Sequence, residues 1–111
     1  MDNGILTSIK NQLSVAIEDE AFDAELVIFI NAAFSILTQL GVGPVEGFRI
    51  SGYDETWDDF VVDIVQEDMA KTYVYLKVKT LFDPPANTSL ANAINEQIRE
   101  YEYRLKLQAE V

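Results

Sequence analysis

Residues 23–41, DAELVIFINAAFSILTQLG, decide how the rest of the chain can fold. Apolar residues recur in this stretch at the spacing of an α-helix and cover most of its circumference. The residues that line its apolar side are Leu26, Ile30, Ala33, Leu37 and Leu40, with Val27, Phe29, Phe34 and Ile36 beside them. The polar residues beyond the first turn, Asn31, Ser35 and Thr38, fall on one narrow stripe. We therefore predict a central helix that the other segments surround.

Both ends of this helix carry residues that usually mark helix ends. Asp23 is predicted as the N-cap, and Phe22 before it is placed to pack on Val27. Gly41 supplies the left-handed residue that often follows a helix C-terminus, and the Gly-Pro pair at 43–44 prevents any continuation. The helix is therefore expected to begin and end at these marks.

The same stretch has a competing interpretation as a membrane span. From Leu26 to Val45 no charged residue occurs, and about twenty apolar residues can cross a bilayer. Asn31, Gln39 and Pro44 interrupt that window, and no Lys/Arg cluster flanks it to set an orientation. The chain start also lacks the basic region of a signal peptide. A core helix of a soluble protein is the favoured interpretation, and no membrane contact is expected.

The composition limits the chemistry that this chain can perform. A chain of 111 residues, 49% of them hydrophobic, is expected to form one domain, 1–111, with a modest core. It has no cysteine and no histidine, which excludes disulfides, thiolate nucleophiles, zinc fingers and Ser-His triads. No motif arranges the remaining carboxylates, lysines, tyrosines and hydroxyls for catalysis. We therefore expect no enzyme activity, no cofactor and no metal.

The charge is strongly acidic and unevenly distributed. The net charge is −11, and residues 1–68 hold fourteen acids against two bases, whereas residues 69–111 hold five acids against six bases. An acidic surface repels the backbone of nucleic acids and favours basic partners or plain solubility. The acidic N-terminal part and the nearly neutral C-terminal part also allow the charge of one copy of the chain to complement that of another.

The remaining segments predict further helices around the central one. Helical spacing and cap residues place them at 5–15 with Asn3 as cap, after Thr56, at 67–82, and from the caps at 87–89 to about Ala109. The alternation of Phe48, Arg49 and Ile50 indicates a short extended segment near 47–53, a minor strand at most. The predicted fold class is mainly α, a small four- to five-helix bundle with a central buried helix and a long C-terminal helix.

Acidic residues cluster around the short helix that follows Thr56. They are Asp54, Glu55, Asp58, Asp59 and Asp63. Trp57, Phe60, Val61 and Ile64 are expected to supply its core side. Paired carboxylates can perform acid–base chemistry, but nothing else in the segment indicates a sugar or phosphate substrate. We interpret the acids as the solvent face of this helix.

The last two helices carry most of the basic residues. Lys71, Lys77 and Lys79 lie along the first of them. The C-terminal helix has a narrow apolar row, Leu90, Ile94, Ile98, Tyr101 and Leu105, and two favourable pairs, Glu100–Arg104 and Glu102–Lys106. Its roughly 30 Å length exceeds what so small a bundle needs. We expect its last turns, with Tyr103, Leu107 and Val111 off the row, to project toward a partner.

Four sequence blocks carry a resemblance to a known family. They are NAAFSILTQLGVGP at 31–44, WDDF at 57–60, KTYVYLKVKTLFDPP at 71–85 and IREYEYRLKLQ at 98–108, preceded by the short first helix. In this order and spacing, the chain resembles the head–tail connector proteins (adaptor or head-completion proteins) of long-tailed bacteriophages and prophages. The resemblance runs from about Ile5 to Gln108, nearly the whole chain.

This resemblance implies a structural role in the virion. The expected protein is a ring subunit at the head–tail junction, made in the bacterial cytoplasm, which binds the portal protein and the next head-completion or tail protein. The ring would contain about twelve copies, to match the portal, and would extend the DNA channel. DNA would pass without sequence-specific binding, and an acidic lining would avoid gripping its phosphates. The family has no active site to transfer.

We also predict which surfaces of neighbouring copies meet. The hypothesis places the bases Lys71, Lys77, Lys79, Arg99 and Arg104 opposite the acids Asp54, Asp58 and Asp59 of the next copy. Apolar contact from Tyr101, Tyr103 and Leu107 would supply most of the affinity, because rim charges mainly set register and association rate.

Two other functions are also compatible with the sequence. One is an acidic regulatory protein of a prophage that mimics DNA, although the nearly neutral C-terminal half does not fit that role. The other is a magnesium-dependent nuclease that uses the carboxylates at 54–63, although no lysine or histidine accompanies them.

Overall fold

Helices dominate the part of the chain that the structure, a computed structural model, describes, which is residues 3–110. They are α1 (Ile5–Gln12), α2 (Asp23–Gln39), α3 (Trp57–Phe60), α4 (Ile64–Phe82) and α5 (Thr88–Ala109). The predicted mainly α fold, a small bundle with a long C-terminal helix, is confirmed.

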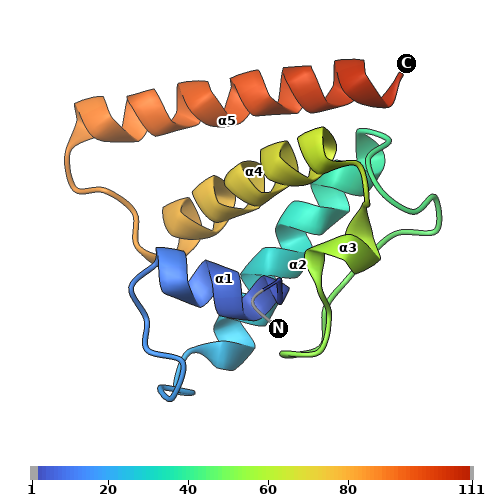
Figure 1. Ribbon diagram of the computed structural model, residues 1–111. Coiled ribbons are helices and arrows are strands. Elements are labelled where there is room, and N and C mark those ends of the chain that lie inside the picture. The colour runs from blue at the N-terminus through green and yellow to red at the C-terminus, as the bar shows by residue number, and fades with distance from the viewer. Residues whose placement is uncertain (1–2, 111) are drawn as a thin grey trace.

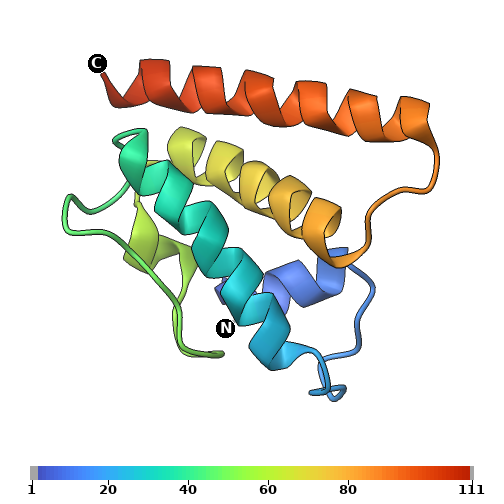
Figure 2. The ribbon, with the colours of Figure 1, turned by 180° about the vertical axis from the view of Figure 1, so that it is seen from behind.

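The helices form layers around α4 (Figure 1). α4 packs against α2 on one side and against α5 on the other, while α3 packs on α4 and α1 on α2. α5 runs back along α4 and forms the outer layer. From behind, α2 lies in front with the 42–55 loop beside it (Figure 2).

The core is built around α2, as its apolar pattern predicts. The α2 side chains that are at most 1% exposed are Leu26, Ile30, Ala33, Phe34 and Leu37. The Phe34 ring lies 5.0 Å from Phe48, 5.9 Å from Trp57 and 4.7 Å from Phe60, measured between ring centroids. One aromatic side chain of α2 therefore holds both the 42–55 loop and α3.

Gly41 terminates α2, as predicted. This residue has φ = +89°, and its N–H donates to Thr38 O at 3.0 Å, while the Val42 N–H donates to Leu37 O at 2.9 Å. These two hydrogen bonds satisfy carbonyls that a helix end leaves without partners. The buried Val42 side chain then returns the chain to the core.

Gly43 permits a close approach that any side chain would block. Its φ is +85°, and a Cβ there would lie 2.3 Å from Cε1 of the Phe60 ring. We expect Gly43→Ala to lower the free energy of unfolding by about 2–4 kcal/mol, because it adds overpacking to left-handed strain. Urea unfolding measures this loss.

Gly47→Ala is the matched control for that substitution. Gly47 has φ = +100°, but a Cβ there would meet nothing within 4 Å. It is expected to incur only the backbone strain, about 1 kcal/mol. Equal losses for the two variants would contradict the contact between Gly43 and Phe60.

The N-terminal ends of α1 and α2 differ from prediction. Gly4, not Asn3, is the N-cap residue of α1, and it has no side chain to cap the helix. The backbone carbonyl of Asn3 accepts the Trp57 N–H at 3.0 Å. α1 ends at Gln12 rather than near residue 15. Asp23 is the first residue of α2 and does not cap it, because its carboxylate binds side chains from elsewhere. Phe22 packs edge-on against Phe82, with centroids 5.3 Å apart.

The boundary between α3 and α4 was also misplaced. Thr56 caps α3 as predicted, in a reciprocal pair of hydrogen bonds with Asp59. Asp63, however, caps α4, where its Oδ1 accepts the N–H groups of Val65 and Gln66. Ile64 therefore opens α4 and is 71% exposed, so its predicted place in the core is wrong.

The segment near 47–53 forms no strand within residues 3–110, where the only β-bridge is an isolated one between Gly4 and Thr56. The Asn31 side chain stands in for a strand partner of Ile50. Its Oδ1 accepts the Ile50 N–H at 2.7 Å, and its Nδ2 donates to the Ile50 carbonyl at 3.0 Å. A polar residue of α2 thus fixes the loop that carries Phe48 and Arg49.

α5 is attached to the core by few residues. Asn87 caps it, and only Ile98 and Leu105 are buried, whereas Leu90 is 52% exposed and does not extend the predicted row. The Tyr73 hydroxyl donates to Glu102 at 2.7 Å, and burial together with this carboxylate raises the Tyr73 pKa. Glu102 is therefore engaged across the helices rather than with Lys106.

Candidate interaction surfaces

Most of the bases predicted at an interface already have acidic neighbours on their own helix. Ion pairs join Lys71 to Glu67 at 3.8 Å, Lys79 to Asp83 at 3.4 Å, Arg99 to Glu96 at 2.9 Å, and Arg104 to Glu100. Lys77 has no ion pair within residues 3–110. Because the exposed pairs of Lys79, Arg99 and Arg104 contribute only about 0–1 kcal/mol each, these three bases can exchange partners at low cost.

The outer side of α5 exposes apolar area near its C-terminal end. Tyr103 is 65% exposed and Leu107 is 46% exposed, and the two are four residues apart on one helix face. Tyr101, predicted with them, instead packs against the core and is half-buried. Of the residues predicted to project from the last turns, Tyr103 and Leu107 are thus available for apolar contact, and Val111 lies outside the described residues.

The predicted acids divide into free and engaged groups. Asp54 and Asp58 are exposed and form no ion pair within residues 3–110, and Asp58 lies beside Glu67. Asp59 accepts the Thr56 N–H at 2.9 Å, so it belongs partly to the cap of α3. Among the residues that the structure describes, no three acids gather in a way that could hold a metal ion.

Glu67 is a buried carboxylate that the sequence interpretation missed. The residue is 8% exposed, and its Oε2 has no hydrogen-bond partner in the described part of the chain. Burial raises the Glu67 pKa, and the neighbouring Asp58 raises it further, while Lys71 lowers it. The fold therefore disfavours the charged form of the Glu67 carboxyl.

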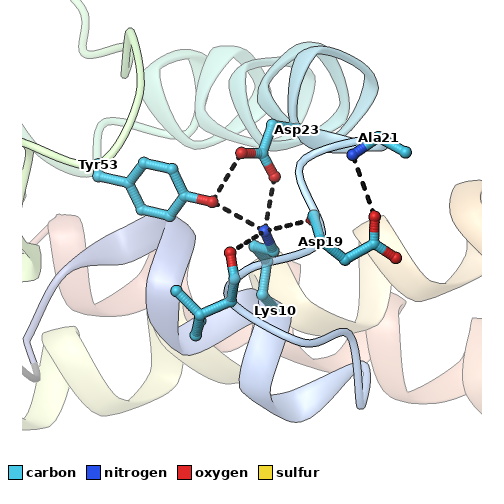
Figure 3. Close-up of polar contacts among 6 residues, drawn as sticks. Lys10, Asp19, Ala21, Asp23 and Tyr53 are labelled. Atoms are coloured by element: carbon cyan, nitrogen blue, oxygen red, sulfur yellow. Dashed lines mark hydrogen bonds and ion pairs between the residues drawn. The ribbon is translucent and has the colours of Figure 1, made fainter.

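Lys10 is the centre of a second, fully engaged polar cluster (Figure 3). The side chain is 0% exposed, and its Nζ lies 2.7 Å from Asp23 Oδ1 and 2.8 Å from the Tyr53 hydroxyl. It also lies 3.1 Å from Ile17 O and 2.8 Å from Asp19 O. The Tyr53 hydroxyl donates in turn to Asp23 Oδ2 at 2.6 Å. This cluster joins α1, the start of α2 and the 51–55 loop.

The cluster is charged at neutral pH. The hydrogen bonds from Lys10 and Tyr53 lower the Asp23 pKa. Burial lowers the Lys10 pKa, but the hydrogen bonds and charge of Asp23 and Tyr53 outweigh it, so this pKa is raised. Burial and Asp23 raise the Tyr53 pKa. Lys10, Asp23 and Tyr53 all bind one another, so the cluster has a structural role: it holds α1, the start of α2 and the 51–55 loop together.

Two adjoining hollows run along the exposed side of α2. One, of about 600 Å³, lies between Ile28, Ser35 and the loop residues Phe48 and Arg49. The other, of about 500 Å³, lies beside Asp23 and Tyr53, and Ile28 belongs to both. Ile28 is 64% exposed, so α2 presents apolar area to solvent as well as to the core.

Within residues 3–110 no helix is long and apolar enough to cross a membrane.

Comparison with known proteins identifies the family. The family model described as "Phage connector protein" matches residues 5–111. No curated protein and no solved structure matches the chain. The family match spans the central helix, the capped α3 and both C-terminal helices, in agreement with the four sequence blocks. The chain therefore belongs to the phage connector protein family.

Proposed function

We propose that this protein is a ring-forming subunit at the head–tail junction of a bacteriophage. The family match over residues 5–111 carries the proposal, because the phage connector family is structural and implies contact with portal and head–tail proteins. In this role the ring sits beneath the portal, extends the DNA channel and presents a docking surface for the next head-completion or tail protein.

The charge of the chain supports passage of DNA rather than binding. A net charge of −11 over 111 residues repels the phosphate backbone, which releases counterions only when basic groups neutralise it. An acidic ring would therefore let DNA slide through. The same charge suits a DNA mimic, but a mimic would act as a monomer or small oligomer on a host protein, so the two roles differ in assembly.

We propose that neighbouring copies meet through unlike surfaces, as a closed ring requires. Tyr103 and Leu107 on the outer side of α5 supply apolar contact. The bases of α4 and α5 exchange their own acidic neighbours for acids near α3, such as Asp54 and Asp59. Since the exchangeable pairs are weak, free subunits stay monomeric in dilute solution and assemble on the portal, with about twelve copies by symmetry matching.

Charge reversal on α5 tests this interface. We expect the double variant Arg99→Glu and Arg104→Glu to reduce connector occupancy on portal-bearing heads by about tenfold, equivalent to roughly 1.4 kcal/mol. Thermal unfolding is expected to stay nearly unchanged, because both side chains are more than 60% exposed. Quantitative mass spectrometry of purified heads measures the occupancy.

The matched control exchanges the two partners of one pair, Glu96→Arg with Arg99→Glu. This variant preserves the pair on the helix and the net charge, so a loss confined to the reversed variant reports intermolecular charge. Full occupancy and normal tail joining with both arginines reversed would remove the charged α5 surface from the proposal.

A further inference from the structure

The exposed side of α2 and the 46–53 loop beside it border a groove (Figure 2). The groove consists of the two hollows that share Ile28, and Phe48 lines the larger hollow from the loop. The exposed α2 residues that line it at helical spacing are Ala24, Ile28, Ala32 and Ser35. No charged residue occurs in α2 after Glu25. The floor of the groove is therefore uncharged over about three turns of α2.

The last turns of α5 carry an apolar pair that suits such a groove. Tyr103 is 65% exposed and Leu107 is 46% exposed. Each lies two residues from Leu105, which is 0% exposed, so both lie on the opposite side of the helix from the core. Proteins commonly bind a helix by laying its apolar face into a groove. The outer side of α5 therefore has the form of a ligand for the α2 groove.

The groove and the outer side of α5 lie on unlike sides of the subunit. α4 packs against α2 on one side and against α5 on the other (Figure 1). Ile28 in the groove lies two residues from Ile30, which is 0% exposed, so the groove faces away from the core just as Tyr103 does. A contact between unlike sides of two copies is heterologous, and such contacts generate rings when the rotation closes.

Charged residues flank the two surfaces in a complementary order. Arg49 and Glu46 line the larger hollow, and both are exposed without an ion pair within residues 3–110. On α5, Glu100 precedes Tyr103 by three residues and Lys106 follows it by three. Glu100 and Lys106 are about 9 Å apart along the helix, and the chain from Glu46 to Arg49 spans at most about 10 Å. The two spacings match, so Glu100 can meet Arg49 while Lys106 meets Glu46.

We propose that the last turns of α5 of one copy lie in the α2 groove of the next copy. This contact rests on the proposed ring function and names the surface that receives Tyr103 and Leu107. Their burial supplies most of the affinity, while the charge contacts set the register and direction of α5 in the groove. To bind Arg49, Glu100 gives up only an exposed ion pair on its own helix. Asp54 adjoins a groove residue and remains for the bases of α4 and α5.

Cross-linking between two singly labelled proteins tests the contact directly. The chain has no cysteine, so Ser35→Cys and Leu107→Cys each introduce the only thiol. Both sites are exposed, and cysteine keeps some apolar character at position 107, so both variants are expected to fold and assemble. The two proteins are mixed on portal-bearing heads and treated with a short bis-maleimide. We expect a product that joins position 35 to position 107, identified by peptide mass spectrometry.

Ser89→Cys mixed with Leu107→Cys is the matched control, because it places the same exposed thiol in the first turn of α5, outside the groove. Equal or faster cross-linking in the control overturns the contact while the ring stands. A product that joins two copies of position 107, or position 107 to the portal protein, in place of the 35–107 product also overturns it. Heads on which an amine-reactive cross-linker finds no multimer of wild-type protein remove both the ring and the contact.

A charge exchange provides a second readout. Arg49→Glu is expected to lower connector occupancy on portal-bearing heads at least about tenfold, because Glu100 of the neighbour then meets a like charge. Arg49→Glu combined with Glu100→Arg restores opposite charges at every contact in the ring and is expected to recover most of the occupancy. Both sites are exposed, so neither variant is expected to change the melting temperature appreciably. Full occupancy of the single variant, or no recovery in the double variant, would overturn the contact between Arg49 and Glu100.

Discussion

Replacement of Phe34 by aspartate is expected to abolish soluble, folded protein. Phe34 is 0% exposed and contacts Phe48, Trp57 and Phe60, which join the loop and α3 to α2. Loss of a buried phenylalanine costs about 3–5 kcal/mol, and an unpaired buried carboxylate adds several more. Since small proteins are stable by about 5–15 kcal/mol, this sum is sufficient to unfold the subunit. Soluble yield and far-ultraviolet circular dichroism measure the effect.

Ser35→Asp is the control, because Ser35 neighbours Phe34 on α2 but is exposed. The same new charge there is expected to leave yield and helicity near wild type. Leu37→Asp, at a second position that is 0% exposed, is expected to behave like Phe34→Asp. Wild-type yield of either buried variant would show that α2 is not the core helix.

Lys10→Met is expected to lower the free energy of unfolding by about 3 kcal/mol. Methionine fills a similar volume, but it removes the donor that Asp23, Tyr53 and two backbone carbonyls share. Breaking a buried ion pair by removing one partner costs about 3–5 kcal/mol, and the 20% exposure of the Asp23 side chain favours the lower end.

A double-mutant cycle separates the pair from the packing. Lys10→Met combined with Asp23→Asn leaves neither charge unpaired, so the combined loss is expected to be smaller than the sum of the single losses. Urea unfolding of the four proteins provides the comparison. Strict additivity would contradict direct coupling between Lys10 and Asp23.

The same pair predicts how stability depends on pH. The Asp23 pKa is lowered by folding, so its stabilisation is present above the carboxyl pKa of the unfolded chain and is lost as pH falls through the folded value. The Lys10 pKa is raised, so its stabilisation is lost as pH rises through the folded lysine value. Glu67 acts oppositely to Asp23, because a raised carboxyl pKa favours folding at mildly acidic pH.

Local patterns were enough to predict most of the helices. The 3.6-residue period of α2, the glycine at its C-terminus and the Thr56 cap all act over a few residues, and all three predictions are confirmed. Asp63 shows where local patterns were ambiguous. It precedes an apolar pair, a position that suits a residue on the surface of a helix as well as an N-cap. Only the position at which α4 begins distinguishes the two roles.

The polar clusters could not be predicted in the same way. Lys10 pairs with residues 13 and 43 positions away, and a local sequence window shows neither distance. One signal was available, since Lys10 is one of two bases among the first 68 residues and follows Leu6 at helical spacing. Glu67 was missed because the predicted helix began there, which made a buried carboxylate resemble an ordinary first-turn acid.

Electron cryomicroscopy of portal-bearing heads with and without the protein tests the central claim most directly. We expect a closed ring of density beneath the portal in the presence of wild-type protein, with helices that fit α2, α4 and α5 and with an open channel along its axis. Heads without the protein should lack this ring. Heads that show no added density at the portal, while the protein stays a monomer that binds a host DNA-binding protein, would contradict the connector role.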